Sequence, residues 1–260
     1  MISLKKRFGK TRYETGIILS GGGARGFAHA GILKALNENN IFPDVISGVS
    51  AGAIVGALYA DGNTPDEIFE IFSSEDKFFK FVRFTVPRKG IFKTVGLTSN
   101  LSKNLKAKTF SELKLPLYVA ATNMSRGEIV YFHEGEILPC ILASASIPVL
   151  FEPVVIEEDL YVDGGVLDNF PVKPLRDLCR KLIGVSLNPI HPEKEFDHLM
   201  RIAERTFRLS VSANISTKFA ECNLVFEPDK LGAFGLLDAS RGKEMFEIGY
   251  ETAMEKLKQP

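Results

Sequence analysis

Ser50 lies in the sequence Gly48-Val49-Ser50-Ala51-Gly52, which has the residue types and the spacing of a nucleophile elbow. An apolar run precedes this motif, and small and apolar residues with helical character follow it. A strand that turns sharply into a helix holds one residue at a strained apex, with its side chain clear of the sheet. Any Cβ at Gly48 or Gly52 would collide, because the two backbones pass closely there. The motif predicts Ser50 as a nucleophile, and a small-residue turn between core elements is the alternative.

A second glycine-rich motif, Gly21–Gly26, separates a buried strand from a helix and also satisfies G-x-G-x-x-G. Glycines at a helix N-terminus expose backbone N–H groups, which bind an anion: either a dinucleotide pyrophosphate or an oxyanion formed during a reaction. A dinucleotide site would have an acidic residue at the end of the second strand, where this chain has Ser50. Parallel strands also bring both motifs to the same sheet edge, so we expect the Gly22 and Gly23 amides to face a carbonyl that Ser50 attacks.

A serine nucleophile needs a base, and the chain offers histidines and one well-placed carboxylate. Asp163 ends a predicted strand and precedes Gly164 and Gly165, which would hold the carboxylate at a tight turn near the site, although Asp-Gly-Gly also forms ordinary turns. A triad of Ser50, Asp163 and His191 has an allowed order. Proline residues bracket His191, however, and the remaining histidines occupy unremarkable positions: His29, His133 and His198.

Four motifs together resemble the sequence blocks of the patatin-like phospholipase family, most closely its bacterial cytoplasmic branch. In chain order they are Gly21–Gly26, Gly48–Gly52, Ala143–Pro148 (Ala-Ser-Ala-Ser-Ile-Pro) and Asp163–Gly165. The resemblance covers about residues 16–188, and four ordered blocks are far more specific than any one of them. No motif in the last seventy or so residues can be transferred.

The resemblance implies a Ser–Asp dyad without histidine, with Ser50 as nucleophile and Asp163 as its base. It also implies an oxyanion site made by the glycine loop and Arg25, that is Gly21, Gly22, Gly23, Ala24 and Arg25. The expected substrate is a phospholipid, a lysophospholipid or another acyl ester, and no cofactor is expected. From the residues alone Arg25 is equally well explained as a solvated or ion-paired arginine.

The expected reaction is ester hydrolysis through an acyl-serine, with a carboxylate whose pKa partial burial would raise. Two alternatives stay open. One is an α/β-hydrolase-type esterase with a histidine base, and the other is a non-enzymatic dinucleotide-binding or regulatory module.

The elements around these residues predict one three-layer α/β/α sandwich with a mainly parallel sheet. Residues 1–15 are polar and basic and predict a tail, and residues 16–260 form one domain without repeats or linkers. Strand 16–20, helix 27–39 and strand 41–50 make a β-α-β unit. Further expected strands cover residues 115–123, 128–133, 154–156, 161–162, 181–187 and 224–226. Further helices are expected at residues 53–59, from Thr64, and at 98–106, 137–147, 196–220 and 239–257.

Composition sets broad limits on function. The chain has 260 residues and a formal net charge of zero, so no global field draws it to nucleic acid. Three scattered cysteines predict free thiols in a reducing compartment, and no C-x-x-C or H-x-x-x-H spacing indicates a metal site. The N-terminus lacks a secretory signal, and the longest uncharged stretch, residues 45–60, is short for a membrane span. We expect a cytoplasmic protein.

Residues 69–92 interleave phenylalanines with basic residues. A cap that touches the membrane surface would have this composition, with rings for acyl chains and cations for head groups. A core helix with snorkelling lysines explains it equally well. Peripheral membrane contact through residues 69–92 is therefore one of two hypotheses.

Overall fold

The computed structural model describes residues 11–73, 95–193, 196, 199–213, 215–236 and 238–258. Within them the chain forms one mixed sheet with the strand order β5-β6-β3-β2-β1-β7-β8, and β4 pairs with β3 in addition. The strands are β1 (Tyr13–Leu19), β2 (Val45–Val49), β3 (Leu117–Asn123), β4 (Glu128–Phe132), β5 (Val154–Ile156), β6 (Asp159–Asp163), β7 (Cys179–Val185) and β8 (Leu224–Phe226).

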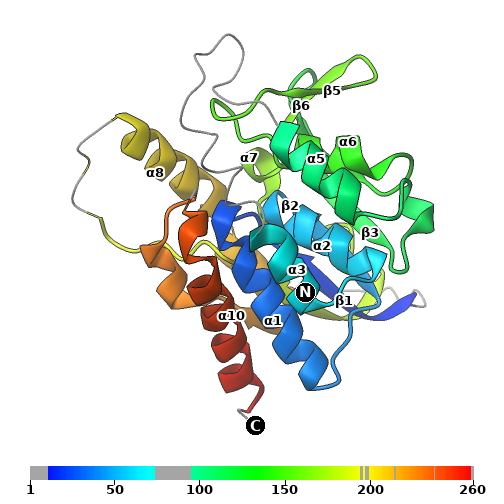
Figure 1. Ribbon diagram of the computed structural model, residues 1–260, viewed down its shortest axis with the longest axis vertical. Coiled ribbons are helices and arrows are strands. Elements are labelled where there is room, and N and C mark those ends of the chain that lie inside the picture. Colours follow the sequence, from blue (N-terminus) through cyan, green and yellow to red (C-terminus); the bar gives the residue numbers. More distant parts are fainter. Residues whose placement is uncertain are drawn as a thin grey trace, which may run out of the picture.

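Helices flank this sheet (Figure 1). They are α1 (Gly26–Glu38), α2 (Ala51–Asp61), α3 (Pro65–Ser73), α5 (Val95–Asn104), α6 (Ile137–Ser144), α7 (Gly165–Asp168), α8 (Leu199–Ser212), α9 (Ile215–Phe219) and α10 (Gly242–Leu257). Short 3-10 turns cover Gly23–Arg25, Phe110–Glu112, Asp229–Ala233 and Ala239–Arg241. The predicted α/β fold with a central, largely parallel sheet is confirmed, and the single predicted helix at residues 196–220 is two helices, α8 and α9.

The predicted β-α-β unit opens the fold, but its first strand starts earlier than expected. β1 pairs in parallel with β2 and with β7, and the β7 pairing begins at Tyr13 opposite Cys179. Residues 13–15 therefore belong to the sheet, and the prediction of a tail over residues 1–15 is wrong for them. Pairing with a distant strand outweighs their polar composition, which is a tertiary effect that local sequence does not reveal.

The edge of β3 determines where the two candidate catalytic residues meet. β4 pairs with one edge of β3, so β2 and β6 share the other. β2 runs parallel to β3 and ends with Val49 opposite Ala120, whereas β6 runs antiparallel and ends with Asp163 opposite Ala121. The two strands approach from opposite directions and end at adjacent registers. Ser50, which follows β2, is thereby brought to Asp163.

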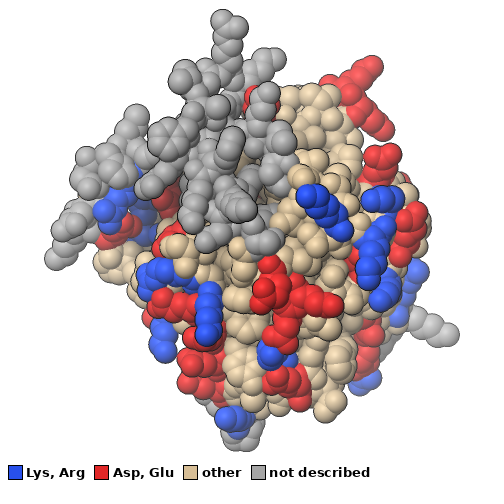
Figure 2. Space-filling view, viewed as in Figure 1, with Lys and Arg blue, Asp and Glu red and all other residues tan. Residues whose placement is uncertain are grey.

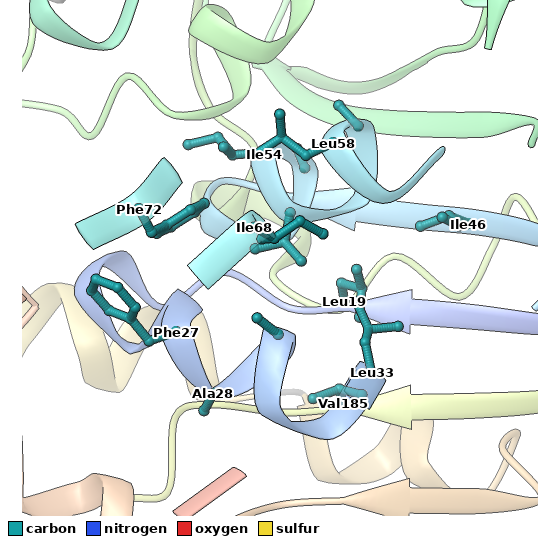
Figure 3. Close-up of a cluster of buried hydrophobic side chains, with 14 of the residues drawn as sticks. Leu19, Phe27, Ala28, Leu33, Ile46, Ile54, Leu58, Ile68, Phe72 and Val185 are labelled. Atoms are coloured by element: carbon teal, nitrogen blue, oxygen red, sulfur yellow. The ribbon is translucent and has the colours of Figure 1, made fainter. Parts of the chain in front are cut away.

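The main hydrophobic core lies between the sheet and helices α1, α2, α3 and α10. Leu19, Ile46 and Val185 project from three neighbouring strands toward Leu33 of α1 and Leu58 of α2 (Figure 3). Alternate strand residues such as Ile18 and Leu182 point to the opposite face, where residues 169–178 and α9 cover them. The second layer thus contains more irregular chain than the sandwich prediction suggests.

Helix α3 begins as predicted, and it contains the first phenylalanines of the stretch 69–92, for which a membrane contact and a core helix are the two hypotheses. The Thr64 hydroxyl accepts the Glu67 amide N–H, and the Glu67 carboxylate accepts the Thr64 amide in return, which is a capping box. Phe69 and Phe72 pack edge-to-face on Phe27 and belong to the core. Residues 74–92 of that stretch lie outside the described residues, including Phe78 and Phe79.

The surface matches the balanced composition. Acidic and basic side chains are interspersed on the face shown in Figure 2, and neither sign forms a continuous field over the described residues there. No helix in the described part of the chain combines the length and the apolar character needed to cross a bilayer.

Candidate active site

Ser50 occupies the apex between β2 and α2, as the elbow motif predicts. Its backbone has φ 54° and ψ −124°, a conformation that non-glycine residues rarely adopt and that is found where surrounding structure enforces it. A Cβ built on Gly48 would lie 2.5 Å from the Gly52 carbonyl oxygen, and one on Gly52 would collide with the Leu19 carbonyl. The two glycines therefore permit the close crossing that strains Ser50.

Asp163 faces Ser50 and accepts a hydrogen bond from its hydroxyl. The amide of Gly165 donates to Asp163 Oδ1 at 2.7 Å, and the Asp163 amide donates to the Ser146 carbonyl at 2.9 Å. A Cβ on Gly164 would strike the Ala120 carbonyl, so glycine there lets the turn after β6 lie directly on β3. The two residues predicted to form a dyad are in hydrogen-bonding contact although 113 positions separate Ser50 from Asp163 in the chain.

Burial raises the pKa of Asp163 to about 6, while hydrogen bonds from Ser50 and Gly165 act in the opposite direction. The carboxyl is 2% exposed, and removal of water disfavours its charged form. A pKa in this range makes the carboxylate a better proton acceptor than an ordinary aspartate while it stays ionised at neutral pH.

Ser144, in the third sequence block, positions the nucleophile. Its hydroxyl accepts the Ser50 amide N–H at 2.8 Å and donates to the Ala120 carbonyl at 2.6 Å. α6 therefore fixes the Ser50 backbone against β3. Because that amide is already bound to Ser144, it does not serve as an oxyanion donor.

The glycine loop passes beside Ser50, but only part of it can bind an oxyanion. Its Gly21 amide donates to Asn169 Oδ1 at 3.2 Å, and its Ala24 amide donates to the Leu236 carbonyl at 2.7 Å. Within the described residues, the Gly22 and Gly23 amides have no hydrogen-bond acceptor, and both residues line a small recess with Ser50 and Asp163. Of the five residues expected from the sequence, Gly22 and Gly23 thus have amides without an acceptor in the described structure, and the oxyanion role of the set stays a prediction.

Arg25 is buried and turned toward the C-terminal part of the chain. Its guanidinium donates to the carbonyls of Phe234 and Leu187 and to Asn188 Oδ1. Burial, with a smaller contribution from the nearby Arg208, lowers the pKa of Arg25 to about 9. These bonds occupy the guanidinium, so Arg25 holds the loop in place, and its part in the oxyanion site stays a prediction from the family resemblance.

The described histidines do not reach the dyad. His29 is buried, with Nε2 2.8 Å from the Ser20 carbonyl, and burial lowers its pKa to about 4. His133 is exposed and stacks on Tyr118. His191 Nε2 lies 3.1 Å from a carboxylate oxygen of Asp229. The triad with His191 as base has no support in these contacts, and His198 lies outside the described residues.

A large cavity of about 1250 Å³ adjoins the recess that holds Ser50. It exceeds the roughly 300–1,000 Å³ usual for small-molecule pockets. Residues of the turn after α6, of α8 and of the segment 229–236 line it, and several of them also border the recess: Ile147, Phe207, Arg208, Val211 and Leu236.

A family profile described as "Patatin-like phospholipase" matches residues 17–176, which include all four sequence blocks. The chain belongs to the patatin-like phospholipase family. Membership agrees with the resemblance stated from the sequence, and it removes the support for a dinucleotide-binding module.

Matches to known proteins extend over nearly the whole chain. "Lysophospholipase nte1" of Emericella nidulans is 26% identical over 93% of this chain and 18% of its own length, so this chain spans about a fifth of that protein. An uncharacterised protein of Acanthamoeba polyphaga mimivirus is 27% identical over 93% of both chains. Among solved structures, VipD from Legionella pneumophila shares the fold with a TM-score of 0.56, 16% identity and coverage of 95% of this chain and 67% of its own.

Three residues that shape the patatin-like site have contacts that the sequence does not predict. Ser144 lies in the third sequence block, whose motif does not indicate the bonds that its hydroxyl makes. Asn169 Oδ1 accepts a hydrogen bond from the Gly21 amide, and Asn188 Nδ2 donates one to the Gly21 carbonyl at 2.6 Å. Single asparagines give no local signal, because the partners of these two are 148 and 167 positions away.

Proposed function

We propose that this protein is a lipid acyl-ester hydrolase of the phospholipase A or lysophospholipase type, with Ser50 as nucleophile and Asp163 as the general base. The hydrogen bond between the Ser50 hydroxyl and the buried Asp163 carboxylate is the observation that carries the proposal. Family membership and the lysophospholipase relatives support the same substrate class.

The chemistry has two halves. Asp163 accepts the Ser50 proton as Oγ attacks the ester carbonyl carbon. The resulting oxyanion accepts hydrogen bonds from the amides of Gly22 and Gly23. The ester C–O bond then breaks, and the leaving alcohol takes the proton from Asp163. Water attacks the acyl-serine while Asp163 again accepts a proton, and the fatty acid leaves as Ser50 is restored.

Two further features favour this reaction. The N-terminus of α2 begins directly after Ser50, and its dipole favours negative charge at that point. The cavity beside the dyad has an apolar wall that includes Ile147, Phe207 and Val211, and it offers room for a long acyl chain.

The decisive experiment measures fatty-acid release from lysophosphatidylcholine together with Ser50 labelling by a fluorophosphonate. Ser50→Ala should abolish both, and Asp163→Asn should lower the rate of fatty-acid release by at least about 10³-fold. Matched controls lie on the same strands. Ser47→Ala removes a buried hydroxyl that has no hydrogen-bond partner among the described residues, and Asp159→Asn changes the carboxylate at the other end of β6. Full activity of a folded Asp163→Asn variant would refute the dyad.

A further inference from the structure

Three arginines of α8 line the large cavity, and their partners differ. Arg201 Nε donates to Glu193 Oε1 at 2.9 Å, and Arg205 also lies within 3.6 Å of that carboxylate while donating to the His191 carbonyl. Arg208 comes one turn after Arg205 and is only 7% exposed. Its Nε has no hydrogen-bond partner among the described residues, and Nη2 makes one long bond, 3.4 Å, to the Pro189 carbonyl.

A buried guanidinium without a carboxylate partner is unusual, because loss of hydration disfavours charge unless hydrogen bonds replace the water. Burial accordingly lowers the pKa of Arg208. Glu204 is the carboxylate that most raises this pKa, but its Oε1 accepts the Leu236 amide N–H. Arg25, also buried, adds a second positive charge nearby and binds neutral oxygens. The described part of this cluster therefore has unbalanced positive charge.

Arg208 stands where the recess and the cavity meet. It borders the recess together with Ser50, Asp163 and Gly22, and it also borders the large apolar cavity. An ester carbonyl at Ser50 would belong to a lipid whose acyl chain occupies the cavity. In a lysophospholipid only the glycerol backbone separates that carbonyl from the phosphate, so the phosphate would lie close to the reacting serine. Guanidinium groups bind phosphate through two or more charge-assisted hydrogen bonds.

We infer that Arg208 is a specificity-determining residue that binds the phosphate of a phospholipid headgroup while the ester carbonyl lies at Ser50. This inference rests on the proposed function and narrows its substrate class from acyl esters in general to esters that carry a phosphodiester. Arg208 touches the substrate but takes no part in proton transfer.

The test compares two substrates with the same acyl chain, 1-acyl lysophosphatidylcholine and the neutral 1-monoacylglycerol. Arg208→Gln should lower kcat/KM for the lysophospholipid by about tenfold or more, mainly through KM, because a charge-assisted contact is lost. The value for the monoacylglycerol should change by less than about two-fold. Arg208→Lys keeps the charge without the planar fork and should fall between wild type and Arg208→Gln. Arg176→Gln, an exposed arginine that pairs with Glu221, is the matched control.

Equal losses on both substrates would overturn the inference and assign Arg208 to the reaction centre or to the fold. Unchanged kinetics on both would also overturn it. A fold defect is detected separately by the thermal midpoint, which should not fall in Arg208→Gln because no carboxylate partner is orphaned.

Calorimetric binding to the Ser50→Ala protein tests Arg208 without turnover. Lysophosphatidylcholine should bind more tightly than monoacylglycerol, and Arg208→Gln should remove that difference. Retention of the difference would overturn the inference even in an active enzyme.

If wild type hydrolyses neither lipid but the binding difference depends on Arg208, the proposed function fails and the phosphate site stands. Inorganic phosphate is the third ligand, and binding as tight as that of the lysophospholipid would indicate a free-anion site and overturn the headgroup assignment.

Discussion

In the proposed mechanism Asp163 combines two properties that oppose each other in water, since it must be ionised to accept a proton and yet basic enough to take one from a serine. Burial supplies the basicity, and the Gly165 amide and the Ser50 hydroxyl preserve enough of the charge. Their balance puts the pKa of Asp163 at about 6, and this value controls how activity depends on pH.

We predict that kcat/KM for a neutral ester falls as the pH drops through about 6 and is level above that pH. Activity falls toward acid pH because only ionised Asp163 can accept the Ser50 proton. The fall comes at a higher pH than for an ordinary aspartate because the pKa of Asp163 is raised in the folded protein. Below the midpoint the rate should fall about tenfold per pH unit. A pH series of initial rates measures this, and His191→Ala should leave the midpoint in place. A midpoint near the ordinary aspartate value, or one that moves with His191, would contradict the assignment.

At the scale of elements, the site is a junction of strand ends and helix ends that α6 holds together. Ser144 connects the Ser50 amide to the Ala120 carbonyl, and Ser146 holds the Asp163 amide through its carbonyl. The Ala-Ser-Ala-Ser block is therefore a brace that contacts both Ser50 and Asp163.

Ser144→Ala should lower the free energy of unfolding by about 2 kcal/mol, because it leaves a buried amide and a buried carbonyl without partners. Activity should fall by about tenfold or more, since the strained Ser50 backbone loses its support. Urea unfolding and initial rates measure the two effects. Ser47→Ala, which removes a hydroxyl without a described partner, should leave both nearly unchanged. Equal effects of the two variants would show that the Ser144 bridge has no special role.

Local signals indicated Ser50, which lies in a glycine-flanked turn after a strand, and the dyad with Asp163 came from the resemblance of the four sequence blocks to the family. The motif pointed to the Gly22 and Gly23 amides, but the sequence could not exclude Gly21 and Ala24 from the wider expected set. That distinction depends on Asn169 and Leu236, which reach the loop only in the folded chain. The sequence could not show what Arg25 binds either, because its acceptors at 187, 188 and 234 are equally remote. Residues 13–15 were predicted as part of a tail because their strand depends on pairing with β7, which lies far along the chain.

At the scale of the whole molecule, Arg25 links the first motif to the last third of the chain. Its guanidinium donates to the Leu187 carbonyl, just after β7, and to Phe234 in the segment that also lines the cavity. The part of the chain without recognisable motifs therefore contributes to the position of the glycine loop.

Arg25→Met should reduce the free energy of unfolding by about 1–3 kcal/mol, because methionine fills the space but leaves buried carbonyl groups unpaired. Activity should fall in parallel, since the Gly22 and Gly23 amides lose their support. Guanidinium-chloride unfolding and initial rates measure this. Arg241→Met, an exposed arginine that stacks on Phe234 and pairs with Glu244, is the matched control and should leave the unfolding midpoint nearly unchanged. A fully stable Arg25→Met protein would show that the linkage is not needed.

β3 supports both Ser50 and Asp163, the proposed nucleophile and base, because β2 and β6 end against the same edge of that strand. Any motion that separated Ser50 from Asp163 would have to break the middle of the sheet. The walls of the cavity, by contrast, are α8, the turn after α6 and the segment 229–236, none of which pairs with β3. Substitutions on those walls should therefore change the preferred acyl-chain length of the substrate. Ester hydrolysis itself should tolerate many such substitutions, because they leave the strands that hold Ser50 and Asp163 in place.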